Sequence, residues 1–385
     1  MARLIEPRGD MRVPIWVWGR TAPEKALSQL ERLAAQPYVI GHIAAMPDLH
    51  VANGIAVGTV FATDGVVVPS ALGGDLGCGV AALRFPFPAR GLSIGTLRRI
   101  LGAWAARIPV GDAVHRGKGA AVPDELMAAP LSTGALEHQR ERLARRHLGT
   151  LGGGNHFVEL DRDAAGDVWL LVHSGSRGLG AAVGGHHFKS AQATGLGEIP
   201  GLAVESEEGR ACIADIGWAL SFAAANRRAL VSAAAEVVAA EIGMGPEQSS
   251  AIDVHHNFVE MEEHLDRRIW VHRKGAIAAQ PGARVLIPGS MGTASYVAEG
   301  RGEPTSFRSA SHGAGRVMTR REAHERIPVE RLAHAMRRVV HDERRSASLV
   351  EEAPAAYRDI GEVLEDEEDL VTPLLRLEPM LVLKG

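Results

Sequence analysis

The pattern of hydrophobic and polar positions along the chain predicts both helices and short strands. Helices are expected at four segments, residues 21–35, 96–108, 137–147 and 211–242. The first helix should open on a capping box formed by Thr21 and Glu24 and should stop before Pro37. The last is rich in alanine and should end before Gly243, because glycine suits a helix C-terminus.

Short runs of β-forming residues lie between these helices. Residues 51–68 combine apolar residues with Gly, Thr and Val, and they predict strands and tight turns that lead to Gly73. Four further runs each end at a polar, histidine-bearing or glycine-rich segment: residues 168–172, 251–254, 268–271 and 285–287. Candidate chemistry therefore lies at strand ends, and we expect a mixed α/β, or α+β, fold.

The organisation of the chain favours one integrated domain over residues 1–385. The sequence has no internal repeat and no Ser/Pro-rich linker. The acidic run at residues 365–369 is interpreted as solvated surface. The active site should therefore be assembled from segments that are far apart in sequence.

Composition narrows the class of protein and its compartment. Hydrophobic residues make up 46% and charged residues 23% of the chain, as in soluble globular proteins. We see no apolar run long enough to cross a bilayer and no signal-peptide stretch, so a cytoplasmic location without membrane contact is expected. Cys78 and Cys212 are the only cysteines, which argues against a disulfide framework. A net charge of -4 argues against non-specific coating of nucleic acid but leaves room for a local basic site.

Potential metal ligands stand beside glycines in several segments. These are GDLGCG at residues 74–79, NH at 155–156, HSGSR at 173–177, HHN at 255–257, and His312. Mixed carboxylate, thiolate and imidazole ligands suit a transition metal such as Mn, Fe, Co or Zn, whereas calcium and magnesium prefer oxygen alone. Cys78 follows Asp75 by three residues in a glycine-rich turn, so both can face one ion. Successive side chains at a strand end face opposite sides, so one of His255 and His256 should reach the metal.

Other cysteines and histidines have a structural interpretation. Cys212 is read as a small buried hydrophobe. His186, His187 and His272 are read as surface or core residues with satisfied hydrogen bonds. Spacing alone does not decide the metal set, because the candidate ligands form no short fixed pattern like that of a zinc finger.

Four glycine-rich loops point to a polyphosphate ligand, because glycine lets backbone N–H groups approach phosphate oxygens closely. They are GTLGGGNH at residues 149–156, SGSRGLG at 174–180, PGSMGTAS at 288–295 and HGAGR at 312–316. The sequence contains no P-loop motif and no lysine in a K-x-D-G setting, so histidine is the better candidate for covalent nucleotide transfer. His312, flanked by Ser311 and Gly313, has the uncrowded setting needed to attack an α-phosphorus and form a phosphoramidate.

Seven motifs in order resemble the RtcB family of RNA ligases. They lie at residues 74–79, 149–159, 173–180, 256–257, 272–275, 288–296 and 312–316. The similarity runs from about residue 40 to the C-terminal Lys384 and Gly385. The resemblance implies a mixed α/β fold peculiar to that family, a monomer and a site for two manganese ions. Residues 111–131 would then be a variable connection.

The resemblance also implies roles for individual residues. The metal ligands would be Asp75, Cys78, His156, His173 and His256, with Cys78 bridging, and His312 would accept GMP. The guanine nucleotide would be held by Asn155, Phe157, Glu159, Ser290, Ser295, Ala314, Tyr357 and Lys384. Arg177 and Arg316 would contact phosphate, although an arginine beside glycines can equally pin a loop. The Glu159 carboxylate can accept from N1–H and N2–H of guanine, which adenine cannot offer, so GTP is expected over ATP.

The activity implied is the joining of an RNA 3′-phosphate or 2′,3′-cyclic phosphate to a 5′-hydroxyl through a GMP–histidine intermediate. The substrates would be tRNA halves or damaged RNA, and members of the family often work with a small activating protein, archease. Two alternatives stay open. A metal-dependent RNA-end phosphoesterase or nucleotidyl hydrolase could use the same metal site, and an RNA-binding or metal-storage protein would need no catalysis.

Overall fold

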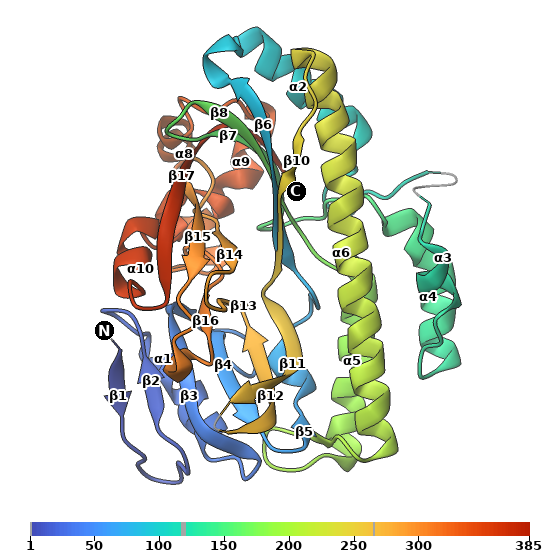
Figure 1. Ribbon diagram of the computed structural model, residues 1–385, viewed down its shortest axis with the longest axis vertical. Helices are drawn as coiled ribbons and strands as arrows, with labels where there is room; N and C mark the ends of the chain where they lie inside the picture. Colours follow the sequence, from blue (N-terminus) through green and yellow to red (C-terminus); the bar gives the residue numbers. More distant parts are fainter. Residues whose placement is uncertain (1, 117–120, 265) are drawn as a thin grey trace.

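The computed structural model describes residues 2–116, 121–264 and 266–385, and it combines helices with two large β-sheets and two small ones. The prediction of a mixed α/β (α+β) fold is therefore confirmed. The two large sheets follow one another along the long axis, and the long helix α6 runs beside both (Figure 1). None of the described helices combines the length and the apolar composition that a membrane span requires.

The first sheet has six strands in the order β1-β2-β3-β4-β12-β11, and all neighbours are antiparallel except β2 and β3. These strands are β1 Arg3–Ile5, β2 Ile15–Val17, β3 Val39–His50, β4 Val57–Thr63, β11 Asn257–His264 and β12 Arg267–Lys274. The pairing of β3 with β4 shifts register between Ala45 and His50, and this irregular end of β3 carries Asp48. The strands expected within residues 51–68 and 268–271 are confirmed.

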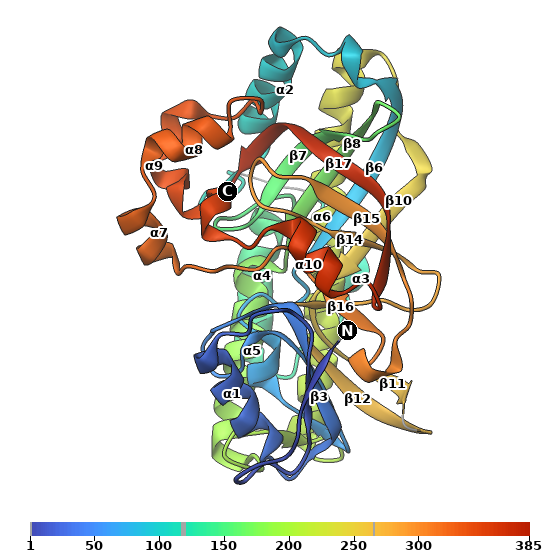
Figure 2. The same cartoon turned by 90° about the vertical axis from the view of Figure 1, so that its left-hand side faces the viewer.

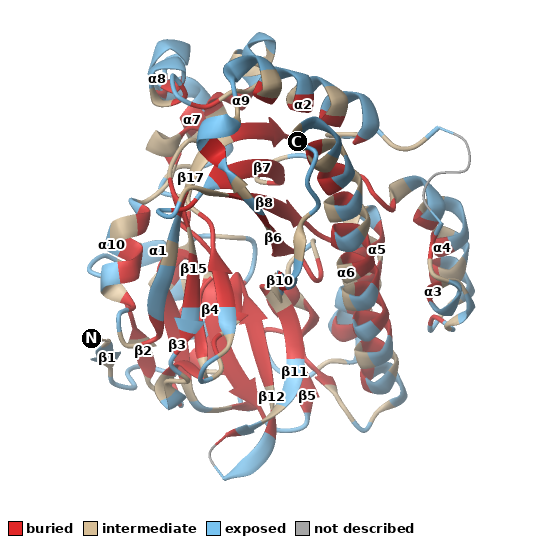
Figure 3. Cartoon of the chain, turned by 45° about the horizontal axis from the view of Figure 1, so that its top comes forward, coloured by how far each residue is buried: buried red, intermediate tan, exposed pale blue. Residues whose placement is uncertain are grey.

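The second sheet has seven antiparallel strands in the order β10-β6-β8-β7-β17-β15-β14. Its strands are β6 Gly79–Pro88, β7 Phe157–Arg162, β8 Asp167–Ser174, β10 Glu247–His255, β14 Arg284–Ile287, β15 Ser295–Gly300 and β17 Val371–Lys384. The small sheets pair β5 Val66–Val67 with β9 Leu202–Ala203 and β13 Ala276–Ala278 with β16 Ser309–Ser311. The central strands are buried, as Figure 3 shows, so both large sheets form part of the core.

Helices cover the sheets and set the positions of several loops. They are α1 Glu24–Ala34, α2 Ile94–Arg107, α3 Asp124–Ala128, α4 Gly134–His147, α5 Arg177–Thr194, α6 Glu207–Ile242, α7 Arg320–Arg326, α8 Val329–Ala335, α9 Ser346–Leu349 and α10 Ile360–Asp366. The predicted helices near 96–108, 137–147 and 211–242 are confirmed as α2, α4 and α6. Helix α6 packs on β6 and β8 and ends, as expected, at Gly243 in the left-handed conformation.

Two local predictions are wrong. Helix α1 begins after Pro23, whose extended backbone precedes Glu24, so Thr21 lies outside the helix and caps nothing. The Thr21 hydroxyl instead accepts from Arg358 Nη1 at 3.0 Å. The acidic run at 365–369 is not uniformly solvated, because Glu367 is fully buried.

The predicted connection at 111–131 is only partly described. The described part of it includes the short helix α3. Residues 117–120 lie outside the described part of the chain.

Candidate active site

Strand register brings four of the five predicted metal ligands to one end of the seven-stranded sheet. His173 pairs with Val80 on one side and with Phe157 on the other, while His255 pairs with Gly79. Cys78 therefore precedes β6, His156 precedes β7 and His256 follows β10, all at the same end of the sheet. Asp75, the fifth, comes from the glycine-rich turn that leads into β6. Ligands more than 170 residues apart in sequence thus meet because adjacent strands end together.

The side chains form two groups that share one sulfur. Asp75, Cys78 and His156 offer one set of donor atoms, and Cys78, His173 and His256 offer the other, with the atoms of each set within 4.8 Å of one another. The Cys78 Sγ lies 3.3 Å from Nε2 of both His156 and His173. The His156 Nε2 lies 3.0 Å from Asp75 Oδ2, and the Nε2 atoms of His173 and His256 are 3.0 Å apart. Donor atoms that converge in this way suit cations bound between them.

The ionisation of these groups suits the same interpretation. Burial, together with the neighbouring imidazoles, lowers the pKa of His173 and of His256 well below the ordinary value, so both rings are neutral and offer lone pairs. Burial opposes the charge on Asp75, but the hydrogen bond with His156 and the charge of Arg177 hold its pKa below the usual range. Burial and Asp75 raise the pKa of the Cys78 thiol, and a bound cation would reverse this by displacing its proton.

Two consecutive residues of α6, not singled out from the sequence, hold the ligand loops in place. The buried Asn226 accepts from Gly149 N at 2.8 Å and donates to Gly175 O at 3.0 Å, so it links two glycine-rich loops. The buried Arg227 donates to Gly77 O at 2.7 Å and binds Asp253. A polar pair inside an alanine-rich helix was the available signal, because such residues persist in a core only when hydrogen-bonded.

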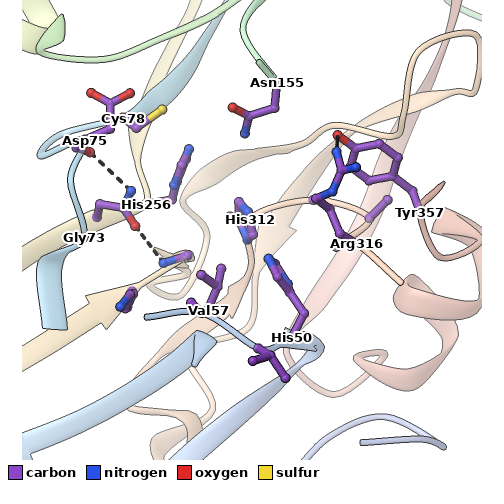
Figure 4. Close-up of a pocket in the computed structure, with 18 of the residues that line it drawn as sticks. His50, Val57, Gly73, Asp75, Cys78, Asn155, His256, His312, Arg316 and Tyr357 are labelled. Carbon is purple, nitrogen blue, oxygen red and sulfur yellow. Dashed lines mark hydrogen bonds between the residues drawn. The ribbon is translucent and has the colours of Figure 1, made fainter. Parts of the chain in front are cut away.

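Five histidines have the positions expected of them. His255 turns away from the ligands, within 3.1 Å of Arg227 Nη2, and His256 turns toward them (Figure 4). His187 and His272 are buried; His187 Nε2 binds Asp215 at 2.8 Å, and His272 Nε2 accepts from Val68 N at 3.0 Å. His186 is partly exposed on α5.

Cys212 is fully buried in the core, as expected. Burial raises the pKa of its thiol to about 12. This cysteine is therefore an inert core residue.

His312 lies beside the ligand cluster. It directly follows β16, and its ring centroid is 4.8 Å from that of His256 (Figure 4). The fully buried Asp48 lies behind it, with Oδ2 at 2.6 Å from His312 Nδ1 and at 3.1 Å from the His312 backbone N. A carboxylate at Nδ1 favours the tautomer whose Nε2 lone pair is free to act as a nucleophile. Asp48 did not stand out in the sequence, because one aspartate in a buried strand carries no motif.

A cavity of about 1300 Å³ connects the ligand cluster to His312 and continues beyond it. Its lining includes Asp75, Cys78, His173 and His256, together with nine of the predicted nucleotide contacts: Asn155, Phe157, Glu159, Ser290, Ser295, Ala314, Arg316, Tyr357 and Lys384. Arg177 is absent from this lining, and its guanidinium lies 3.4 Å from both Thr150 Oγ1 and His156 Nδ1. Arg177 therefore pins the loop at 149–156 in this structure.

The far part of the cavity is lined by a buried ion-pair network. Glu352 is its centre and was not singled out from the sequence. It accepts from Tyr357 OH at 2.7 Å and from Arg316 Nη1 at 3.2 Å, and its Oε2 lies 3.1 Å from Lys384 Nζ. The Lys384 ammonium also lies 5.5 Å from the ring centroid of Phe157. One carboxylate thus holds three of the predicted nucleotide contacts in place.

A carboxyl pair lies on strand β7, in the same region of the molecule. Glu159 and Asp161 alternate with residues of the opposite face and so point the same way, and both are buried. Burial and the charge of Asp161 raise the pKa of Glu159 well above the ordinary value, and burial raises the pKa of Asp161. Repulsion between two buried carboxylates favours the retention of a proton by the pair.

The structure places carboxylate, sulfur and imidazole donors beside a histidine in a glycine-rich cleft, and this arrangement defines a class of protein suited to metal-dependent phosphoryl transfer. The family model described as tRNA-splicing ligase RtcB matches residues 29–385. The chain therefore belongs to the RtcB family, and the resemblance seen in the sequence is confirmed.

Individual relatives match along nearly their whole length. The RNA-splicing ligase RtcB of Escherichia coli strain K12 is 35% identical over 97% of each chain. The RNA-splicing ligase RtcB of Mycobacterium tuberculosis strain H37Rv is 32% identical, covering 93% of this chain and all of the relative. The tRNA-splicing ligase RtcB of Thermococcus kodakarensis is 30% identical, covering 97% and 95%.

Proposed function

We propose that this protein is a GTP-dependent RNA ligase that joins RNA 3′-phosphate or 2′,3′-cyclic phosphate ends to 5′-hydroxyl ends. The observation that carries the proposal is the position of His312, beside two donor groups that share Cys78 and within one cavity. Membership of the RtcB family supports it. The substrates are RNA ends, from tRNA halves or damaged RNA.

Two manganese ions fit the donor set. Asp75, Cys78 and His156 would hold one, Cys78, His173 and His256 the other, and Cys78 would bridge them. Manganese accepts oxygen and nitrogen donors together with one thiolate. Bound there, the ions would supply charge neutralisation for phosphate oxygens and activation of an attacking hydroxyl.

His312 and Asp48 carry the first chemical step. The His312 Nε2 lone pair attacks the α-phosphorus of GTP, an N–P bond forms, and the bond to pyrophosphate breaks. Asp48 holds the proton on Nδ1 and stabilises the charge that develops on the ring. An oxygen of the RNA 3′-phosphate then takes the GMP from His312, which leaves the RNA end activated. Attack by the 5′-hydroxyl of the second RNA forms the phosphodiester and expels GMP.

The predicted nucleotide contacts would hold GTP so that its α-phosphate reaches His312. Asn155, Ser290 and Ala314 line the cavity as it passes His312, and Arg316 and Lys384 supply positive charge. Phe157, Ser295 and Tyr357 would enclose the base, and Glu159 would accept from guanine N1–H and N2–H. Arg177 would act on phosphate only after releasing the loop that it now pins.

We propose a cytoplasmic monomer that folds as one domain, with archease as an activating partner. Site residues from both large sheets support the single domain, because Asp48 lies on β3 and Phe157 on β7. The two free, buried cysteines fit a reduced compartment.

A ligation assay tests the proposal. Manganese-loaded protein, GTP, an RNA with a 3′-phosphate and an RNA with a 5′-hydroxyl should yield joined RNA and GMP over many turnovers, and ATP should not replace GTP. An RNA ending in a 3′-hydroxyl is the matched control and should not be joined. Free phosphate without joined RNA would instead indicate a phosphoesterase or hydrolase, and RNA binding without turnover would indicate a non-enzymatic protein.

Acid should weaken GTP binding through Glu159. A protonated Glu159 offers guanine one acceptor fewer than a carboxylate does, and the pKa of this group is raised. The affinity for GTP should therefore fall as the pH is lowered, by up to about tenfold per pH unit below the pKa. Asp161→Asn removes the neighbouring charge and lowers the pKa of Glu159, so its affinity should begin to fall at a lower pH.

Calorimetric titration of GTP into both proteins between pH 5.5 and pH 8, above the ordinary range of carboxyl pKa values, would measure this shift. Effects of pH on the metal site cancel because both proteins share that site. Superimposable pH curves for the two proteins would contradict the assignment of Glu159 to the base.

A further inference from the structure

A second buried carboxyl group lies behind His312, close to Asp48. Glu367 directly follows helix α10 and is fully buried. Its Oε2 accepts from Ser311 N at 2.9 Å, and the next peptide N–H, that of His312, donates to Asp48 at 3.1 Å. Two consecutive backbone donors at the end of β16 are therefore held by two different carboxyl groups. Figure 2 shows α10 above β16, as this contact requires.

Polar atoms of this cluster are buried without hydrogen-bond partners in the part of the chain that the structure describes. Asp48 Oδ1, Glu367 Oε1 and Ser311 Oγ are all buried without a hydrogen-bond partner among the described residues. A buried carboxylate oxygen without a donor is costly, whereas a protonated carboxyl supplies one itself. A proton on Glu367 thus adds a donor to a cluster that has free acceptors.

The charges around Glu367 also favour its protonated, neutral form. Burial raises the pKa of Glu367 to about 8, and the carboxylates of Asp48 on β3 and Asp369 on its own segment act in the same direction. The hydrogen bond from Ser311 acts against this shift but is outweighed. Asp369 is itself held by Trp18 Nε1 at 3.0 Å, and His312 faces Asp48.

We propose that Glu367 is a positioning residue for His312. Held as a neutral acid, it fixes the backbone that carries the imidazole and leaves Asp48 as the single negative charge behind the ring. This inference rests on the proposed role of His312 as the nucleophile. An ionised Glu367 would add a second buried negative charge beside Asp48, disturbing the contact that sets the His312 tautomer.

The test compares the wild type with Glu367→Gln, because glutamine matches the shape and hydrogen bonding of the neutral acid and does not titrate. The rate of GMP transfer from GTP to the protein is measured from pH 6 to pH 9.5. The wild-type rate should fall above pH 8 by up to about tenfold per pH unit, and the variant should not show this fall. Glu367→Asp, which shortens the reach to Ser311, should lower kcat at every pH and leave KM for GTP unchanged.

The second readout is stability, measured without metal by denaturant unfolding. Glu367 keeps its proton in the folded state to about pH 8 but loses it near pH 4.5 when unfolded. The folded state therefore binds more protons in this window, so wild-type stability falls as the pH rises from 4.5 to 8. Relative to Glu367→Gln, the wild-type folding equilibrium should weaken by up to about tenfold per pH unit there.

The outcomes separate this inference from the proposed function. Parallel pH profiles of the rate in the wild type and Glu367→Gln would overturn the positioning role. A stability difference between these two proteins that does not change with pH would overturn the neutral state of Glu367. A Glu367→Gln protein that fails to fold would also overturn it, since the amide should be the better tolerated form. A wild type that acquires no GMP at any pH would instead refute the proposed function, and the stability comparison would still report the ionisation of Glu367.

Discussion

Replacing His312 by alanine should reduce the transfer of GMP from GTP to the protein below detection, by at least about a thousandfold. The reason is that, in the proposed mechanism, the imidazole forms the bond to the α-phosphorus through Nε2, while Nδ1 faces Asp48. Incubation with α-labelled GTP and manganese, followed by denaturing electrophoresis, measures the covalent label. Acid-labile, alkali-stable label identifies a phosphoramidate. Binding of GTP itself should change little, because the predicted base contacts lie elsewhere in the cavity.

Two matched variants sharpen this experiment. His334→Ala removes an exposed histidine of α8 and should label like the wild type. Asp48→Asn keeps the shape of the residue behind His312 but removes its charge, so labelling should slow by about a hundredfold without abolition. Labelling of His312→Ala at the wild-type level would show that another residue receives GMP.

Much of the fold could be predicted because it depends on local signals. The helices α2, α4 and α6 follow from residue types that favour helices, and Gly243 marks the end of α6 as only a residue tolerant of positive φ can. The wrong prediction of a cap at α1 shows what local sequence signals cannot determine. Thr21 and Glu24 have the spacing of a capping box, but Pro23 sets the start of the helix and Arg358, 337 residues away, takes the Thr21 hydroxyl.

The same spacing does form a capping box elsewhere in the chain. Thr319 and Glu322 form a complete capping box at the start of α7. The two sites have the same residue types at the same separation, and only the surrounding contacts distinguish them. Caps are therefore easier to confirm in a structure than to select from a sequence.

The candidate site could be predicted where its side chains are of chemically distinctive types. A cysteine, an aspartate and histidines beside glycines stand out, and the structure brings Asp75, Cys78, His156, His173 and His256 together. Residues that act from behind the site did not stand out. Asp48, Glu352 and Glu367 are buried carboxyl groups without motifs, and only three-dimensional packing shows which functional side chain each one contacts.

Cys78→Ser should have the largest effect on metal binding, because both donor groups depend on one sulfur. A serine hydroxyl does not ionise to bridge two cations as a thiolate does. The affinity for manganese should fall by at least about a hundredfold at both positions, and ligation should fall with it. Equilibrium dialysis with metal analysis measures the stoichiometry, which should drop from two equivalents toward none at concentrations that saturate the wild type.

Variants of the ligands that belong to one donor group alone test whether the two groups share Cys78. His156→Ala removes a donor from the group with Asp75, and His256→Ala removes one from the group with His173, so each should lose one equivalent and retain the other. Cys212→Ala, at the buried core cysteine, should bind two equivalents. Metal should also raise the unfolding temperature of the wild type but not of Cys78→Ser, since a ligand stabilises only the state that binds it. Two tightly bound equivalents in Cys78→Ser would mean that the sulfur is not shared, and the two groups would then have to be independent sites.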